Sequence, residues 1–283
     1  MPHYSNIEKR KQIASNWFQT LRDKLCIEFA AIEAEYSQST EFNNPQFIRK
    51  QWSRDGGGGG EMSIMRGQVF EKVGVNISTV YGELSNVFAK EIPGTKNSQQ
   101  FWASGISLVA HMHSPFVPAV HMNTRLIVTE ESWFGGGADM TPVFDVAADT
   151  KMFHQALKNA CDKIDLAYYP KFKKQCDEYF YLPHRKETRG VGGIFYDYLN
   201  TGNWDKDFKF TRLVGSALCE VYPKIVRKYM LKQWSPAEKE QQLIKRGRYA
   251  EFNLLYDRGT KFGLMTDGNI EAIFMSMPPQ ANW

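Results

Sequence analysis

The stretch from residue 107 to residue 139 holds most of the side chains in this chain that could do chemistry. It contains three of the six histidines, His111, His113 and His121, together with Arg125 and Asp139. An imidazole exchanges protons near neutral pH, a guanidinium binds carboxylates through paired hydrogen bonds, and a carboxylate can serve as a base. The stretch therefore predicts proton transfer combined with recognition of acidic groups.

An alternating pattern over 120–128 predicts a β-strand that positions these groups. Reading in steps of two places His121, Asn123 and Arg125 on one face and a mainly apolar set on the other. Because a strand rises about 3.3 Å per residue, successive side chains on one face stand about 7 Å apart. We expect the apolar face to pack against the core and the polar face to line a site.

A second strand is predicted just before it, over 105–112. Ser107 and His111 fall on one side of that strand, and the proline-rich segment 114–118 ends it and forms a loop. Two antiparallel strands in this arrangement would present five side chains to one cavity: Ser107, His111, His121, Asn123 and Arg125.

Two glycine-rich segments accompany these strands. Residues 133–137 read Trp-Phe-Gly-Gly-Gly, and we interpret them as a turn from which Asp139 projects as a potential base. The glycine run at 56–60 lacks the Gly-Lys-Ser/Thr sequence of a phosphate-binding loop and the spacing of a dinucleotide fold. It is either a structural turn or a flexible loop able to lie over a flat ligand.

The other segments predict an α+β protein. Residues 5–36 carry apolar side chains at steps of three and four, which predicts a long amphipathic helix covering a sheet. Short strands that follow one another in sequence favour antiparallel pairing. With no low-complexity linker in the chain, we expect one domain over 1–283.

Three later segments complete the prediction. We expect a helix over 207–233 with a break or kink at Pro223, and a further helix that Ser235 caps. We predict that 249–277 returns to strands.

The composition of the chain bears on the class of ligand that it binds and on its cellular compartment. The net charge of +4 is spread out and suits an anionic small molecule as well as any other ligand, and no arginine-rich block argues for nucleic acid. The four cysteines have no Cys-x-x-Cys spacing. We expect neither a secretory signal nor a membrane span, and a cytoplasmic location.

Several chemistries remain open from the residues alone. The His111-x-His113 pair is similar to that of cupin oxygenases, but the glutamate that should follow is absent. No Gly-x-Ser-x-Gly elbow and no cysteine in a catalytic context support acyl transfer. Arg125 and Arg189 with aromatic walls favour a flat, multiply carboxylated ligand. Four histidines could still converge on a metal: His111, His121, His154 and His184.

Several motifs in collinear order resemble the oxygen-dependent coproporphyrinogen III oxidase family, from about Trp52 to Trp283. They read WSRDGGGGGEMS, VFEKVGVNIS, HxxxPxxPxVHMNTR, WFGGGADMTP, FYLPHRKETRGVGGIFYDYLN, GRYAEFNLLYDRGTKFGL and IEAIFMSMPPQANW. The resemblance implies oxidative decarboxylation of two propionate groups of coproporphyrinogen III to vinyl groups, giving protoporphyrinogen IX with O2 as electron acceptor. It also implies a large antiparallel sheet between helices, and no flavin or nicotinamide.

The resemblance assigns roles to individual residues. By motif, Asp139 is the proposed base at a pyrrole N–H, His121 the proposed proton donor and Arg125 the partner of a substrate propionate. Ser107 and Asn123 correspond to substrate contacts. Bacterial members are described with a divalent metal on the four histidines named above, whereas other members need none. A homodimer is implied, with 248–277 as the proposed contact region.

One departure from the family concerns a substrate-binding loop near the C-terminus. Where relatives carry Gly-Gly-Arg or Gly-x-Arg, this chain has Asp267-Gly268-Asn269, which removes a positive charge. We expect Arg189 or another basic group to compensate. Three alternatives stay open: a non-catalytic tetrapyrrole carrier, a histidine-ligated iron oxygenase and a structural protein.

Overall fold

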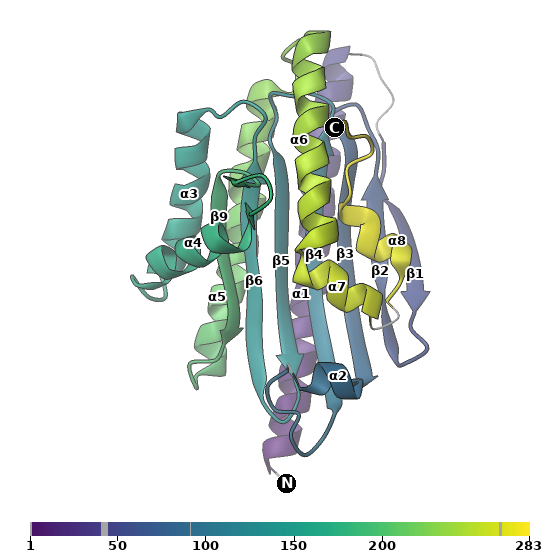
Figure 1. Ribbon diagram of the computed structural model, residues 1–283, viewed down its shortest axis with the longest axis vertical. Coiled ribbons are helices and arrows are strands. Elements are labelled where there is room, and N and C mark those ends of the chain that lie inside the picture. The colour runs from purple at the N-terminus through teal and green to yellow at the C-terminus, as the bar shows by residue number, and fades with distance from the viewer. Residues whose placement is uncertain (1, 41–44, 91, 266–267) are drawn as a thin grey trace.

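A seven-stranded antiparallel sheet forms the centre of the protein, with strand order β1-β2-β3-β4-β5-β6-β9 (Figure 1). The structure is a computed structural model that describes residues 2–40, 45–90, 92–265 and 268–283. The strands are β1 (Ile48–Ser53), β2 (Gly58–Met65), β3 (Phe70–Glu83), β4 (Gln100–Met112), β5 (Ala119–Val128), β6 (Ser132–Thr141) and β9 (Gly192–Leu199), with a separate pair β7 (Tyr181–Leu182) and β8 (Glu187–Thr188).

Helices cover both faces of this sheet, so the predicted α+β architecture is confirmed (Figure 1). The helices are α1 (Pro2–Thr40), α2 (Asn86–Ala89), α3 (Ala147–Asp162), α4 (Tyr168–Tyr179), α5 (Trp204–Tyr229), α6 (Pro236–Leu255), α7 (Arg258–Met265) and α8 (Ile270–Ile273), with the 3-10 turn η1 (Phe274–Ser276). Helices α1 and α5 lie behind the sheet and α6, α7 and α8 lie in front. No helix among the described residues has the length and apolar character needed to cross a membrane.

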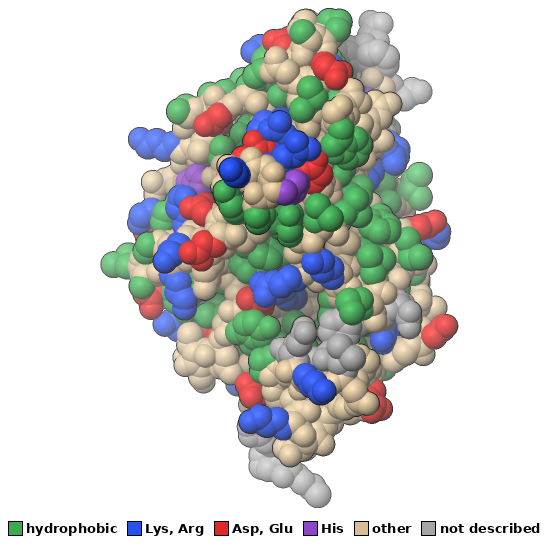
Figure 2. All heavy atoms as spheres, in the orientation of Figure 1, with side chains coloured by type: hydrophobic (Ala, Val, Ile, Leu, Met, Phe, Trp, Pro, Cys, Tyr) green, Lys and Arg blue, Asp and Glu red, His purple; other side chains and the backbone are tan. Residues whose placement is uncertain are grey.

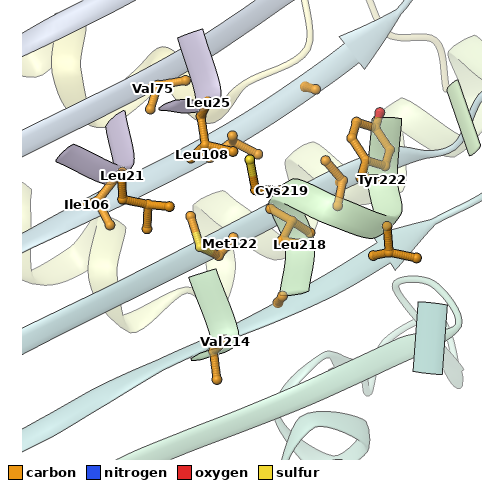
Figure 3. Packing of buried hydrophobic residues seen from close by; sticks show 14 of the residues in the cluster. Leu21, Leu25, Val75, Ile106, Leu108, Met122, Val214, Leu218, Cys219 and Tyr222 are labelled. Atoms are coloured by element: carbon orange, nitrogen blue, oxygen red, sulfur yellow. The ribbon is translucent and has the colours of Figure 1, made fainter. Parts of the chain in front are cut away.

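The main core lies between the sheet and the pair α1 and α5. Leu25 of α1, Leu108 of β4, Met122 of β5 and Leu218 of α5 are all fully buried there (Figure 3). Burying such a side chain stabilises the fold by about 1.5–3 kcal/mol. Because side chains alternate along β5, its apolar residues pack into this core and its polar residues face the other side of the sheet.

The predicted helices exist, with changes at their ends. The N-terminal helix runs over Pro2–Thr40 instead of 5–36. Helix α5 continues past Pro223, because Tyr222 and Val226 on either side are fully buried and their packing outweighs the lost backbone hydrogen bond. Ser235 caps α6 with a reciprocal capping box formed with Glu238.

The prediction of strands over 249–277 is wrong. The described residues of this range include the end of α6, then α7, α8 and η1. The buried residues Tyr249, Phe252 and Asn253 lie three and four positions apart, so the aromatic residues that suggested a strand line one face of a helix.

The interpretation of residues 133–137 as a turn is wrong, and the structural turn considered for residues 56–60 is present only at the start of that run. Residues 133–137 lie within β6, and Gly58 to Gly60 lie within β2. Only the start of the first run turns the chain: Gly57 and Gly58, with φ of 113° and 83°, close the β1–β2 hairpin. In β6 the missing side chains let backbones approach, since a Cβ on Gly137 would stand 2.2 Å from the Ile194 carbonyl oxygen.

Candidate active site

Strands β5 and β6 place the predicted catalytic side chains on the sheet face that carries α6, α7 and α8. His121 of β5 lies directly opposite Asp139 of β6, and Arg125 lies opposite Gly135. Ser107 of β4 lies opposite Asn123. The antiparallel register therefore brings together, in adjacent rows, the side chains that sequence alternation had assigned to one face.

A hydrogen-bonded chain joins His121, Asp139 and Arg189. The Nδ1 atom of His121 is 2.7 Å from Oδ1 of Asp139. Arg189 Nη2 donates to the other oxygen, Oδ2 of Asp139, at 2.6 Å. Both carboxylate oxygens are therefore engaged, and Asp139 is only 3% exposed.

The electrostatics keep Asp139 ionised. Burial alone raises the pKa of Asp139, but the charge of Arg189 and the hydrogen bond from His121 outweigh it and hold that pKa below its ordinary value. For the same reason the pKa of Arg189 is raised: burial lowers it, and the nearby Asp139 charge more than compensates. The pair is a buried, hydrogen-bonded ion pair.

Arg189 is enclosed by aromatic rings. Its guanidinium carbon lies 4.0 Å from the ring centre of Phe180, 4.4 Å from that of Tyr249 and 4.9 Å from that of Phe252. Its Nη1 donates to Oδ1 of Asn253 at 3.0 Å. Arg189 is thus a buried partner of Asp139, and the expectation that it replaces the basic group missing at 267–269 is not met.

Arg125 has a more open position. Its side chain is 31% exposed, and Nη2 lies 2.9 Å from Oδ1 of Asp197 in β9. On the other side Nη1 donates weakly to Oδ1 of Asn123 at 3.4 Å, and Asn123 Nδ2 lies 3.3 Å from Nε2 of His121. A partly exposed guanidinium therefore stands next to the His121–Asp139 pair.

Small residues form a floor beside these groups. Ser78, Gly105, Arg125 and Gly135 occupy one row across β3, β4, β5 and β6. The next row is Asn76, Ser107, Asn123 and Gly137. Three strand spacings give this floor a width of about 14 Å, and its glycines and serines keep much of the sheet surface low. Such a surface suits a flat ligand.

Two hollows of the described structure lie outside this floor. A cavity of about 20 Å³ lies beside His111, Gln242 and Arg246, enough for roughly one water molecule. A wider groove of about 550 Å³ is lined by α3 and α5, which lie away from the site. Ser78, Ser107 and Asn123 of the floor are partly exposed, whereas Asn76, Gly135 and Gly137 are buried.

The four histidines expected to share a metal are not brought together. His111 Nε2 lies 2.9 Å from the carbonyl oxygen of Ser276, and His121 binds Asp139. His154 contacts the Val191 carbonyl oxygen and the Tyr169 hydroxyl. His184 contacts Tyr256 and Glu251. Within the described ranges no group of three or more His, Cys, Asp or Glu is arranged to hold a metal ion, so the residues do not fit this metal site.

The structure describes only part of the loop near the C-terminus that contains residues 267–269. Asp267 lies outside the described residues. The backbone N–H of Gly268 donates to the Gly263 carbonyl oxygen at 2.9 Å. Asn269 caps α8, because its side chain accepts from the N–H of Ala272 at 3.0 Å. The described part of the loop thus serves local structure.

Three residues of the site were not predicted: Asp197, Asn253 and Arg258. Asp197 stands two positions after Phe195 in β9, so the same period of two that identified β5 could have placed it on the site face. Asn253 stands four residues after Tyr249, at helical spacing. The wrong assignment of 249–277 to strands concealed both Asn253 and Arg258.

Comparison with known proteins agrees with the motifs. A family model described as coproporphyrinogen III oxidase matches residues 13–283. The oxygen-dependent coproporphyrinogen-III oxidase of Rickettsia bellii (strain OSU 85-389) is 61% identical over 276 residues, covering 98% of this chain and 99% of that protein. The proteins of the same name from Rickettsia akari (strain Hartford) and Rickettsia africae (strain ESF-5) are 62% identical, over 97% and 98% of this chain and 99% of each relative. The chain belongs to the coproporphyrinogen III oxidase family.

Proposed function

We propose that this chain is an oxygen-dependent oxidase of haem biosynthesis that converts two propionate groups of coproporphyrinogen III to vinyl groups, giving protoporphyrinogen IX. Membership of the family and the names of its relatives support this activity. The observation that carries it at the site is the exposed Arg125 guanidinium next to the buried His121–Asp139 pair, above a flat floor.

Each turnover at one propionate balances with O2 as the co-substrate. The side chain loses one hydrogen from the carbon next to the ring and its carboxylate as CO2, which leaves a vinyl group and releases two electrons. O2 accepts these electrons with two protons and becomes hydrogen peroxide. The electron-rich tetrapyrrole reacts with O2 itself, so the task of the protein is placement and control of charge.

The residues divide this task between them. Arg125 holds a propionate carboxylate by charge-assisted hydrogen bonds, and Ser107 and Asn123 contact the ligand from the floor. Asp139 was predicted as the base at a pyrrole N–H. Its burial and its two occupied oxygens favour a role through His121: Asp139 holds Nδ1, and Nε2 exchanges the proton with the substrate.

An aerobic assay tests the proposal. Purified protein is incubated with coproporphyrinogen in air and without air, and the porphyrins are separated after oxidation. We expect the product with two vinyl groups only in air. Binding without conversion in air would indicate a tetrapyrrole carrier instead. A rate that is lost with a chelator and regained with iron would indicate an iron oxygenase.

We also propose that the chain is a single domain that works as a homodimer in the cytoplasm. The contact region 248–277 carries exposed apolar side chains on three helices, including Leu254, Leu264 and Ile270 at 54%, 43% and 64% exposure. The described cysteines are all buried and unpaired, in keeping with a reducing compartment.

A further inference from the structure

We propose that Tyr198 determines substrate specificity, because it completes an apolar shelf that receives the methyl group beside the propionate held by Arg125. The shelf consists of Tyr198, Trp133 and Ile127. This inference deepens the proposed function and rests on it. Its starting point is a strained backbone, since Tyr198 has φ of 53°, in the left-handed region that a bulky side chain avoids. A protein retains such a position where the surrounding structure enforces it, and these positions cluster at binding sites.

A β-bulge in β9 produces this backbone conformation. The pairing of β6 with β9 shifts by one residue, so that Asp197 and Tyr198 together stand opposite Gly135. A bulge of this kind redirects side chains and is frequent beside active sites. The backbone N–H of Tyr198 donates to Oδ1 of Asp197 at 3.1 Å, and the same oxygen lies 2.9 Å from Nη2 of Arg125. The bulge therefore links the position of Tyr198 to the carboxylate that holds Arg125.

The bulge also brings the ring of Tyr198 to the sheet face that carries α6, α7 and α8. Regular alternation would place it beside Tyr196, which is fully buried in the main core behind the sheet. Instead the ring packs against Trp133, with ring centres 5.4 Å apart. Trp133 lies on the face of the site, because it stands two residues before Gly135, where a Cβ would be 3.0 Å from Nη2 of Arg125.

The shelf borders the row of side chains that contains Arg125. Ile127 of β5 lies directly opposite Trp133 of β6, just as Arg125 lies opposite Gly135. The two rows are two residues apart along the strand, which is about 7 Å. Trp133 is only 4% exposed and forms the base of the shelf, whereas Tyr198 is 48% exposed and offers ring surface to a ligand. An apolar surface therefore begins where the carboxylate-binding position ends (Figure 1).

The group that the shelf receives follows from this order of charge and apolar surface. Each pyrrole ring of coproporphyrinogen III carries one propionate and one methyl group on neighbouring carbon atoms. With the propionate on Arg125, the methyl group of the same ring lies beside the shelf. Burying a methyl group there is favourable, whereas a carboxymethyl group would lose part of its hydration at an apolar surface. The shelf should therefore favour tetrapyrroles that carry methyl groups over those that carry carboxymethyl groups.

Tyr198→Asn and Tyr198→Phe test the proposal, with Lys186→Asn as matched control. Asparagine tolerates a positive φ, so Tyr198→Asn removes the ring without adding backbone strain. Lys186 has φ of 55°, is exposed and lies in the turn between β7 and β8, so Lys186→Asn repeats the backbone change outside the shelf. Ile127→Thr is a second shelf variant, which keeps a β-branched side chain in β5 and leaves the bulge intact.

The first measurement is the affinity for two oxidised porphyrins by fluorescence, which needs no turnover. Coproporphyrin has four methyl groups, and uroporphyrin has four carboxymethyl groups in their place. We expect wild type to prefer coproporphyrin, and we expect Tyr198→Asn and Ile127→Thr to reduce this preference about tenfold. Tyr198→Phe and Lys186→Asn should keep the wild-type preference. In the aerobic assay Tyr198→Asn should raise KM about tenfold with kcat within about twofold.

Several outcomes would overturn the shelf. One is a wild-type protein that binds both porphyrins equally well. Another is a preference in Tyr198→Asn that is unchanged, or changed no more than in Lys186→Asn, even if its melting temperature falls, because that result indicates packing alone. If Tyr198→Asn does not fold, the preference of Ile127→Thr decides. Binding with the expected preference but without conversion in air would remove the proposed function and still support the shelf.

Discussion

At the scale of single residues, the central feature is a carboxylate that cannot reach a ligand directly. One carboxylate oxygen of Asp139 is hydrogen-bonded to His121, and the other is hydrogen-bonded to Arg189. A buried ion pair of this kind costs desolvation energy and is stabilising only with good geometry, which the aromatic enclosure of Arg189 provides. The arrangement fixes the orientation of His121 and places its Nε2 on the side away from Asp139, 3.3 Å from Nδ2 of Asn123.

Asp139→Asn should therefore lower kcat by about 100-fold or more while substrate binding persists. The amide cannot balance the charge of Arg189 or fix the same tautomer of the His121 imidazole. It should also destabilise the fold by about 3 kcal/mol, because Arg189 stays buried without its counter-ion. Steady-state kinetics and urea unfolding measure the two effects. A wild-type kcat in a folded variant would remove Asp139 from the mechanism.

The buried imidazole of His111 predicts how the stability of the protein depends on pH. Burial lowers its pKa to about 3 from an ordinary value of 6.5; the hydrogen bond to Ser276 acts against this, and the charges of Arg246 and Lys72 act with it. The folded protein keeps this imidazole neutral while the unfolded chain binds a proton below pH 6.5. The stability it contributes is therefore complete above that pH and is lost progressively as pH falls toward the folded pKa.

We expect the free energy of unfolding to fall by about 2 kcal/mol from this residue alone between about pH 7 and pH 5. The pKa values of His113 and His154 are lowered by burial as well and act in the same direction. Urea titrations at the two pH values test this, with His111→Gln as comparison. A variant as pH-sensitive as wild type would contradict the assignment.

At the scale of elements, strand β6 combines two kinds of glycine. A Cβ at Gly135 would meet the flexible ends of Asp197 and Arg125, whereas a Cβ at Gly137 would stand 2.2 Å from the backbone oxygen of Ile194. Side-chain ends can move aside, but a paired backbone cannot move without breaking the ladder with β9. Gly135 therefore makes room for side chains of the site, whereas Gly137 makes room for the pairing of β6 with β9.

Gly135→Ala should raise KM with little change in melting temperature, because it displaces Arg125 from its ion pair with Asp197. Gly137→Ala should lower the melting temperature clearly, because it separates β6 from β9. The two variants are each other's controls in a thermal melt and a kinetic assay. Equal losses of stability in both would argue against this division.

At the scale of the whole molecule, one face is left with uncovered apolar surface. Leu254 and Leu255 end α6, Leu264 and Met265 end α7, and Ile270 begins α8, with exposures between 43% and 64%. Figure 2 shows hydrophobic side chains over this part of the molecule. Contiguous exposed apolar side chains mark interaction surfaces, and a second copy of the chain is the occupant we propose.

Leu254→Glu combined with Leu264→Glu should turn the dimer into a monomer, because the charges would be buried without partners. Leu166→Glu is the control: Leu166 is 75% exposed and lies in the connection between α3 and α4, away from the proposed interface. Sedimentation velocity reports the state of each protein. A wild-type monomer, or dissociation by the control variant alone, would refute the interface.

Local patterns in the sequence determined much of this protein. The period of two in 120–128 predicted the face shared by His121, Asn123 and Arg125, and the spacing at Ser235 predicted a capped helix. Both features depend on contacts between residues only a few positions apart. The collinear motifs predicted the family, which the comparisons confirm.

Only the tertiary structure decided which partners these residues have. Arg189 reads in sequence as a free carboxylate-binding group, but the fold buries it against Asp139 and three aromatic rings. Arg258 lay in a segment predicted as strand, and the fold makes it a helical neighbour of Arg125. Arg189 and Asp139 are 50 residues apart, so their pairing depends on how the elements of the fold pack, which no local pattern encodes.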